Sequence, residues 1–409
     1  MTAVDTMNRC APRVAWVVSS PTPYKLPFFE LLAKNPEWDL HFYFCTWAST
    51  TRPWQLDPSS EIQATTDQGI RLPLPGGYGS CLRLNPRILR ALFRERWDLV
   101  VVSGYNHPTM QLAILGCIAR RIPFIIQGES HLHKPRSLLT RTVKRWLIFP
   151  LLRRAAAALA TGTAARQYWE SIGIPAGRIG IVANTPEVGY FSSEAESLRP
   201  HRARLRGELG LPESAVVGVF VGRLIPVKGV DLALKGLAGL PPAQRPHLLI
   251  VGDGPERSNL EQIAAEHCLP ITFAGFRQRD ELPACYAASD FFFLPSREEP
   301  WGVVVNEAMA CGLPVLLSDQ VGAAYDLLQE GGNGFLVRGA DAANWSDAFR
   351  RCSEARASLP RMGDRSRGFV QGWTHQASAD EFTKVARIAL NGWEANGGAD
   401  GSERDDREQ

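Results

Sequence analysis

Short apolar runs alternate with stretches of helical periodicity along most of the chain. In the first half we expect strands at 14–19, 40–45, 98–103, 123–127, 158–163 and 179–184, and helices from about residue 24 and over 108–121. In the second half we expect strands at 216–222, 247–254, 271–276, 290–296, 314–319 and 333–337, with helices at about 256–267 and 280–288 and from Gly302. This alternation is typical of βαβ units, so the pattern predicts an α/β fold with parallel sheets.

The hydrophobic pattern stops and restarts once. Residues 185–200 are polar and turn-prone, so we place a domain boundary at about 188–200. We expect a Rossmann-like N-terminal domain over 12–190, a second one over 200–372, a helix at 373–393 that packs back on the first, and a disordered tail at 394–409. Two doubly wound domains would face a cleft, where open α/β sheets place their ligands. Residues 50–80 are predicted to be a long loop.

Composition and cysteine spacing favour a cytoplasmic location. A chain of 409 residues is too long for one ordinary core, which supports two domains. No run of about 20 apolar residues is present, the N-terminus lacks the apolar core of a signal peptide, and the eight cysteines are scattered singly. The absence of paired cysteines and of any Asp-x-Asp motif predicts that no metal or other cofactor is needed.

Basic residues are concentrated in one segment. Between Lys134 and Trp169 there are eight basic residues and no acid, although the whole chain carries only +3. Apolar residues at helical spacing accompany these charges. Residues 134–154 are therefore either a peripheral contact with the inner face of an anionic membrane or a surface helix that packs on the core, and the sequence leaves both open.

The segment VGRLIPVKG, residues 221–229, is a candidate anion site. A strand ends near Gly222, and Arg223 and Lys228 follow in a loop that opens a helix. Two cations beside a helix N-terminus suit phosphate oxygens. By contrast, the Gly-x-Gly turn VGDGP at 251–255 lacks the third glycine of a dinucleotide fingerprint, so a tight turn and a nucleotide-contacting loop remain open.

The segment EEPWGVVVNEAMACG, residues 298–312, carries two acids eight positions apart. Glu299 is expected in a loop after a buried strand, and Glu307 about five residues into a helix. Helix capping explains Glu299 but not Glu307, which follows a run of apolar residues. Carboxylates that accept vicinal hydroxyls, on either side of amides that bind phosphate, suit a nucleotide sugar.

These motifs together with ITFAGF at 271–276 resemble the retaining glycosyltransferases of family 4, the glycosyl transferases group 1, which have the GT-B fold. The resemblance is strong over about 216–340 and weaker in the N-terminal half. It implies a hexosyltransferase that uses a UDP- or GDP-sugar and a glycan or lipid-linked acceptor. Exopolysaccharide, lipopolysaccharide or glycolipid assembly would be its setting, and nucleic acid is not an expected partner.

The resemblance also implies roles for individual residues. Arg223 and Lys228, in the loop that begins at Gly222, would hold the donor diphosphate and stabilise its charge as it leaves. Glu299 would orient the sugar and Glu307 would accept the ribose hydroxyls. The remaining donor contacts would come from backbone at four further residues, Gly302, Val303, Phe276 and Arg277.

The N-terminal half departs from the family pattern. Many relatives carry two glycines in the first strand-to-helix loop, whereas SSPTPYKLP at 19–27 has none. This loop, with Tyr24, is a candidate for the acceptor side, as is Tyr105 in SGYNHP. In QGESHLHKP, His131 is the candidate catalytic or acceptor-contacting histidine, with Glu129 beside it.

Two other functions fit the same motifs. A GT-B nucleotide-sugar epimerase or hydrolase would turn over its donor without an acceptor. A non-catalytic nucleotide-sugar binder would keep its role after substitution of Lys228 or Glu299, provided that its affinity survived. The paired acids and the basic N-terminal segment favour the transferase.

Overall fold

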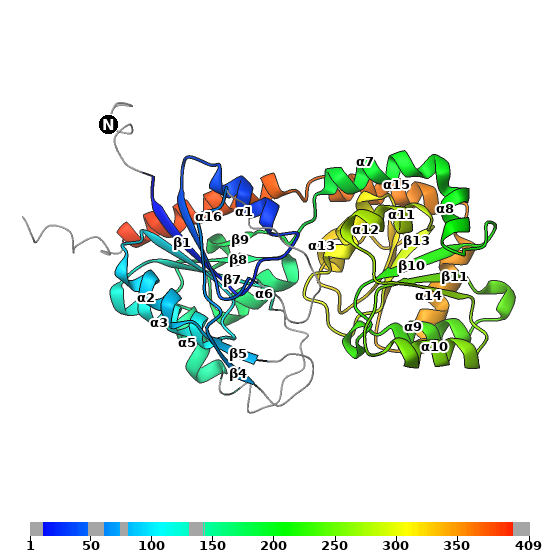
Figure 1. The fold of residues 1–409 in the computed structure, drawn as a ribbon, viewed down its shortest axis with the longest axis horizontal. Helices are drawn as coiled ribbons and strands as arrows, with labels where there is room; N and C mark the ends of the chain where they lie inside the picture. Colours follow the sequence, from blue (N-terminus) through cyan, green and yellow to red (C-terminus); the bar gives the residue numbers. More distant parts are fainter. Residues whose placement is uncertain (1–10, 48–60, 74–80, 131–141, 143, 396–409) are drawn as a thin grey trace, which may run out of the picture. The chain divides into compact units, whose positions relative to one another are not determined.

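The computed structural model describes residues 11–47, 61–73, 81–130, 142 and 144–395. The described chain forms two compact α/β units. One contains residues 1–161, 165–183 and 375–409, and the other contains 162–164 and 184–374. The α/β class predicted from the apolar alternation is confirmed in both units (Figure 1).

The first unit is built on a seven-stranded parallel sheet in the order β3-β2-β1-β6-β7-β8-β9. Its strands are β1 (Arg13–Val18), β2 (Asp39–Phe44), β3 (Ala64–Thr66), β6 (Leu99–Ser103), β7 (Phe124–Gly128), β8 (Ala157–Ala160) and β9 (Ile179–Ile181). Its helices are α1 (Leu26–Ala33), α2 (Pro86–Arg94), α3 (Pro108–Arg120), α5 (Phe149–Leu152), α6 (Thr163–Ile172) and α16 (His375–Ala395), with a π-helical turn at Lys144–Ile148 and a 3₁₀ turn at Ala176–Arg178.

Both faces of this sheet are buried, which explains the uninterrupted apolar runs of its strands. Along β1, Trp16 and its alternate neighbours face the core under α1 and α16, where the Trp16 and Phe382 rings stack at 5.0 Å. Ala15 and Val17 face the other core, which α2, α3 and α6 cover. The C-terminal helix α16 therefore helps to cover one face of the sheet of the first unit.

The second unit has a six-stranded parallel sheet in the order β12-β11-β10-β13-β14-β15. Its strands are β10 (Val217–Val221), β11 (His247–Val251), β12 (Ile271–Gly275), β13 (Phe291–Leu294), β14 (Val315–Ser318) and β15 (Gly334–Val337). Its helices are α7 (Val188–Leu198), α8 (Arg202–Glu208), α9 (Val230–Ala238), α10 (Arg257–Glu266), α11 (Leu282–Ala287), α12 (Val303–Ala310), α13 (Ala324–Leu327), α14 (Ala342–Glu354) and α15 (Leu359–Val370). Short 3₁₀ turns lie at Arg199–His201, Pro226–Lys228, Pro242–Gln244 and Arg279–Glu281. Figure 1 shows α9, α10 and α14 over one face of this sheet and α7, α11, α12 and α15 over the other.

Two local expectations are wrong. The segment 185–200 is not turn-rich, because 188–198 forms helix α7, which buries Val188, Phe191 and Ala195. These residues recur at helical spacing and pack one stripe inward, which outweighs the polar composition. The supposed long loop at 50–80 contains β3 and also β4 (Ile70–Pro73), which pairs antiparallel with β5 (Cys81–Leu84). Residues 48–60, 74–80 and the tail beyond 395 lie outside the described part of the chain.

Candidate active site

The strand order of the second unit identifies the site. Strands β10, β11 and β12 are added in one direction and β13, β14 and β15 in the other, so the order reverses between β10 and β13. In open parallel sheets, ligands bind at the carboxyl ends of the strands at such a reversal. The loops after β10 and β13 are the two segments that the sequence analysis singled out.

Backbone hydrogen bonds join the loop after β10 to the loop after β11. Leu224 N donates to Asp253 O at 2.9 Å, and Gly222 N donates to Val251 O at 3.0 Å. A Cβ at Gly252 would lie 1.9 Å from Gly222 O, so the first glycine of the Gly-x-Gly turn permits this close approach. The structure therefore gives the turn a packing function.

Lys228 is directed towards the β13 loop by its own backbone. It ends a 3₁₀ turn, and Gly229 follows with φ +66°. A Cβ at Gly229 would lie 2.1 Å from Pro295 O, so only glycine allows this approach. Arg297 locks the two loops together, because its guanidinium binds both carboxylate oxygens of Asp231 at 2.7 and 2.8 Å.

The consequence is an ion pair between Lys228 Nζ and Glu299 Oε2. The Lys228 side chain is 19% exposed and the Glu299 side chain 13%, so the pair is largely withdrawn from water but still accessible. The structure thus brings together the predicted cation and the predicted sugar-orienting acid. Arg223 lies half-buried in the same loop, directly after Gly222.

The Glu299 backbone is fixed by the loop after β14. Its N–H donates to Gln320 O at 3.2 Å, and its carbonyl accepts from Gly322 N at 2.9 Å. Trp301 is buried, and its indole N–H donates to Asn306 Oδ1 at 3.0 Å. These contacts hold the 299–302 loop rigidly over the start of α12.

The N-terminus of α12 has no side-chain cap among the described residues. Gly302 occupies the N-cap position with φ +99°. The first amides of a helix lack intrahelical acceptors and suit an anion. Val303 is the first helical residue. The predicted amides of Gly302 and Val303 therefore lie at the start of α12, shortly after Glu299 in the chain.

Glu307 is the fifth residue of α12, in the position that the sequence predicted. Tyr286 of α11, which is itself fully buried, donates a hydrogen bond from its hydroxyl to Glu307 Oε2 at 2.9 Å. Burial raises the pKa of Glu307 to about 7, although the Tyr286 hydrogen bond and the positive charge of Arg279 oppose this shift. The sequence analysis missed Tyr286, since no motif links it to a residue 21 positions away.

Phe276 and Arg277 directly follow β12, the strand at one edge of the second sheet. The Phe276 side chain is 45% exposed, which is unusual for a large aromatic residue. Arg277 forms an ion pair with Glu281 at 3.0 Å across one helical turn. An exposed aromatic ring at this edge is suited to a planar base.

In the first unit the predicted acceptor residues separate into two groups. Lys25 Nζ pairs with Glu129 Oε1 at 3.4 Å, which joins the 19–27 loop to the end of β7, and the carbonyl of Tyr24 lies 3.2 Å from His375 Nε2. Tyr105 is only 3% exposed, and its hydroxyl contacts the Tyr168 hydroxyl at 2.5 Å, so it packs in the core. His131 lies outside the described residues.

The structure adds two findings on metals and membranes. Among the described residues, no group of three or more His, Cys, Asp or Glu side chains is arranged to hold a metal ion. In the same part of the chain, no helix combines the length and the apolar character that crossing a bilayer requires.

Comparison with known proteins identifies the class. Residues 201–369 match the model of the glycosyl transferases group 1, and residues 40–185 match a glycosyl transferase 4-like domain. The chain belongs to the group 1 glycosyltransferases, as the resemblance indicated.

Two individual proteins are similar to this chain in sequence. A D-inositol 3-phosphate glycosyltransferase of Nocardia farcinica is 33% identical over 58% of this chain and 53% of its own length. The sulfoquinovosyl transferase SQD2 of Arabidopsis thaliana is 31% identical over 74% of this chain and 58% of its own length. The chain therefore spans about half the length of these relatives.

Solved structures confirm the GT-B fold. HepE of Anabaena, solved with UDP and glucose, gives a TM-score of 0.68 at 20% identity over 92% of this chain and 99% of its own. Sucrose-phosphate synthase of Thermosynechococcus elongatus gives 0.69 at 20% identity over 93% of this chain and 100% of its own.

Proposed function

We propose that this chain is a retaining hexosyltransferase that uses a UDP- or GDP-sugar and a glycan or lipid-linked acceptor. The observation that carries the proposal is the Lys228–Glu299 pair at the sheet reversal, beside the uncapped N-terminus of α12. A cation and free amides suit a diphosphate, and the adjacent carboxylate suits sugar hydroxyls. Glu307, further along α12, suits the ribose.

We propose the following reaction. The bond between the anomeric carbon and the diphosphate oxygen breaks while a bond to the acceptor oxygen forms on the same face of the sugar. The acceptor proton passes to the departing phosphate oxygen. Lys228 and Arg223 stabilise the charge that develops on the diphosphate, and Glu299 orients the sugar, so positioning and electrostatics lower the barrier.

Lysine and arginine take the part that a metal ion plays in other transferases, and the proposed reaction is metal-independent. On the acceptor side we propose Tyr24, Glu129 and His131. Exopolysaccharide, lipopolysaccharide or glycolipid assembly remains the proposed setting.

The experiment is a thermal-shift screen of the full chain against UDP, GDP, ADP and their common sugar conjugates. UDP comes first, because HepE shares the fold and was solved with it. We expect one nucleotide to stabilise the protein, with the shift lost in Lys228→Ala and Glu307→Ala. Lys384→Ala, an exposed lysine of α16, is the matched control. A folded protein that no nucleotide stabilises would contradict the proposal, and donor turnover that needs no acceptor would favour the epimerase or hydrolase.

We also propose a peripheral location on the inner face of the cell membrane. Trp146 is 72% exposed and Leu147 is 65% exposed, and Arg145 lies next to them on the surface. Exposed apolar residues beside cations suit an anionic membrane surface. Residues 134–141 and 143 of the predicted segment lie outside the described chain.

A further inference from the structure

A cluster of arginines lies at the edge of the second sheet opposite to the candidate active site. Arg202 and Arg206 bind Asp290, which directly precedes β13, and Arg199 donates to Cys311 O, beyond the end of α12. These contacts lie at the amino ends of the strands, whereas Lys228 and Glu299 lie at the carboxyl ends. The cluster is therefore separate from the donor site.

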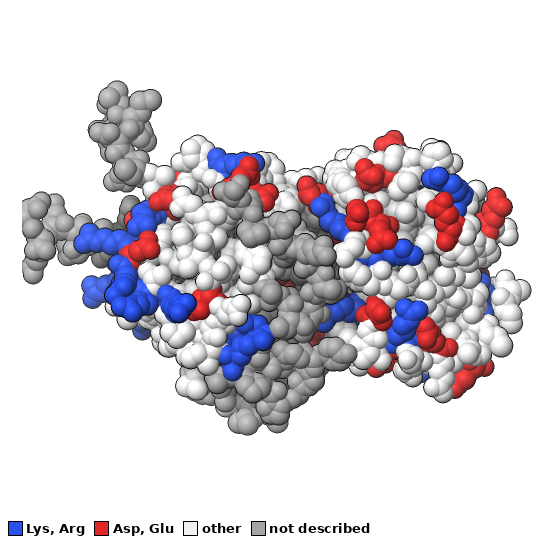
Figure 2. All heavy atoms as spheres, viewed as in Figure 1, with Lys and Arg blue, Asp and Glu red and all other residues white. Residues whose placement is uncertain are grey.

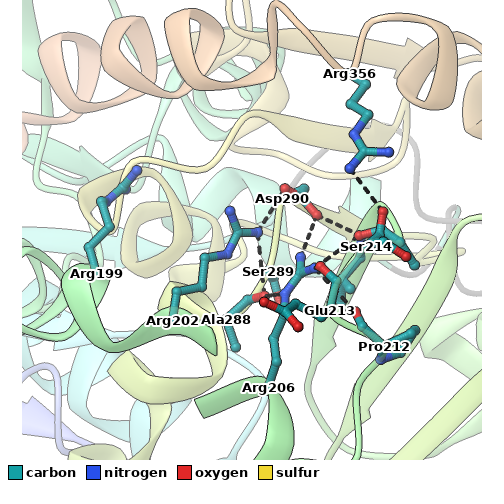
Figure 3. A network of polar contacts seen from close by, with 12 residues as sticks. Arg199, Arg202, Arg206, Pro212, Glu213, Ser214, Ala288, Ser289, Asp290 and Arg356 are labelled. Carbon is teal, nitrogen blue, oxygen red and sulfur yellow. Dashed lines mark hydrogen bonds and ion pairs between the residues drawn. The ribbon is translucent and has the colours of Figure 1, made fainter. Parts of the chain in front are cut away.

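Arg206 is the structural member of this cluster. It is 5% exposed, and its guanidinium donates to the carbonyls of Ala288, Pro212, Glu213 and Ala215 and to Asp290 (Figure 3). These bonds use its donors within the fold. Arg206 therefore needs no ligand, but it fixes Asp290 and the position of α8.

Three further arginines converge beside it and are only partly used. Figure 3 shows Arg199 and Arg202 extending in the same direction from one helical segment. A Cβ added to Gly312 would meet Arg367 Nη1 at 2.2 Å and Arg199 Nη2 at 2.9 Å, so these two guanidinium groups meet over the same glycine. Arg202 and Arg367 side chains are 36% and 35% exposed, which leaves the group open to a solute.

The charges of this cluster do not balance. Of the four guanidinium groups, three pair with only two carboxylates in the described structure, because Asp290 serves both Arg202 and Arg206, and Asp364 serves Arg367. Arg199 donates to a carbonyl instead. Mutual repulsion is evident, since Arg367 and Arg202 add to burial in lowering the pKa of Arg199. In addition, Arg202 Nε is buried and has no hydrogen-bond partner among the described residues. Excess positive charge and a buried donor that no described residue uses both suit an anionic ligand.

We propose that Arg199, Arg202 and Arg367 form a second anion site, which binds a small molecule through a phosphate or diphosphate group. Planar guanidinium forks match phosphate oxygens in pairs, and three of them suit a dianion better than a carboxylate. The competing explanation is purely structural. Arg199 contacts the carbonyl at the end of α12 and Arg206 the one at the end of α11, where cations are favourable.

The test is calorimetric titration with inorganic phosphate and with pyrophosphate, against sodium chloride at matched ionic strength. It is done in the Lys228→Ala protein, so that the donor site contributes little. We expect saturable binding that weakens at least about tenfold in the additional Arg199→Ala and Arg367→Ala double variant, because each lost charge-assisted bond costs about that factor. Arg204→Ala, an exposed arginine of α8, should leave affinity within about twofold.

Lysine substitutions keep the experiment interpretable if the alanine variant is unstable. Arg199→Lys with Arg367→Lys keeps both charges but removes the forks, so it should retain folding and bind with reduced affinity. A response no larger than that to sodium chloride would overturn the proposal. So would equal binding in the arginine variants, or a response that exists only when Lys228 is present, which would assign the ion to the donor site. A changed melting temperature without a change in anion affinity would support the structural explanation.

Discussion

Lys228 and Glu299 meet although they are 71 positions apart in the chain. Each follows a central strand of a parallel sheet, and the carboxyl ends of neighbouring strands lie at one edge. The sequence predicted that each would lie near the ligand site, but it did not predict the ion pair between them. It did not predict the Tyr286 contact to Glu307, because that contact depends on how α11 packs against α12.

Because Glu299 pairs with Lys228, its effect on UDP affinity can be separated from its effect on sugar transfer. In Glu299→Gln the carboxylate that neutralises Lys228 is lost, so UDP should bind as tightly as in the wild type or more tightly. Transfer should fall at least about 10²-fold, because the sugar is no longer oriented. Calorimetry with UDP and turnover of the identified donor measure the two effects. A parallel loss of both would show that Glu299 acts on the diphosphate, contrary to the proposed role.

Glu307 makes stability depend on pH. Its folded pKa is raised from 4.5 to about 7, so the protonated form is favoured in the native state. The resulting stabilisation is complete below about pH 4.5 and is lost as pH rises through 7. Between pH 5 and 8, wild-type stability should therefore fall relative to that of Glu307→Gln by roughly 2–3 kcal/mol. Urea unfolding at both pH values tests this, and parallel pH profiles in the two proteins would contradict it.

At the scale of elements, most strands of the two parallel sheets were predictable because they are short apolar runs buried on two faces. Strand β3 was not predicted, because its three residues are largely exposed and not strongly apolar. Helix α7 was not predicted either, since Val188, Phe191 and Ala195 are embedded in polar residues whose composition suggested turns. The helix could be predicted only by giving the helical spacing of these three residues more weight than the polar composition of the segment. The close approach of Gly252 to Gly222 O likewise depends on tertiary packing. The sequence therefore left open whether the Gly-x-Gly turn serves packing or nucleotide binding.

Gly229 should be intolerant of any side chain. Its φ of +66° and the 2.1 Å approach to Pro295 O both exclude a Cβ. Gly229→Ala should destabilise the protein by about 1–3 kcal/mol or more and weaken nucleotide binding, because Lys228 moves. Gly368→Ala in α15 is the control, since nothing lies within 4 Å of its added Cβ, and there alanine should stabilise by up to about 1 kcal/mol. Equal effects at the two positions would refute the assigned constraint.

At the scale of the whole molecule, charge does not mark the visible face of the second unit as a membrane-binding surface. Figure 2 shows basic and acidic side chains intermixed over the second unit, with no sign prevailing on that face. The distinguishing feature of the first unit is apolar, because Trp146 and Leu147 are the most exposed large hydrophobic residues of the described chain. Binding of such a surface to an anionic membrane is favoured by the burial of its apolar area and by the attraction of Arg145 to anionic headgroups.

We expect the protein to co-sediment with phosphatidylglycerol vesicles and much less with phosphatidylcholine vesicles. The Trp146→Ser and Leu147→Ser double variant should bind the anionic vesicles at least about tenfold more weakly, because two apolar side chains no longer enter the interface. Leu112→Ser with Leu115→Ser is the matched control, since these leucines of α3 are 42% and 43% exposed. Binding that survives in the first variant, or is lost equally in both, would mean that the Trp146 segment is an ordinary surface turn of the first unit.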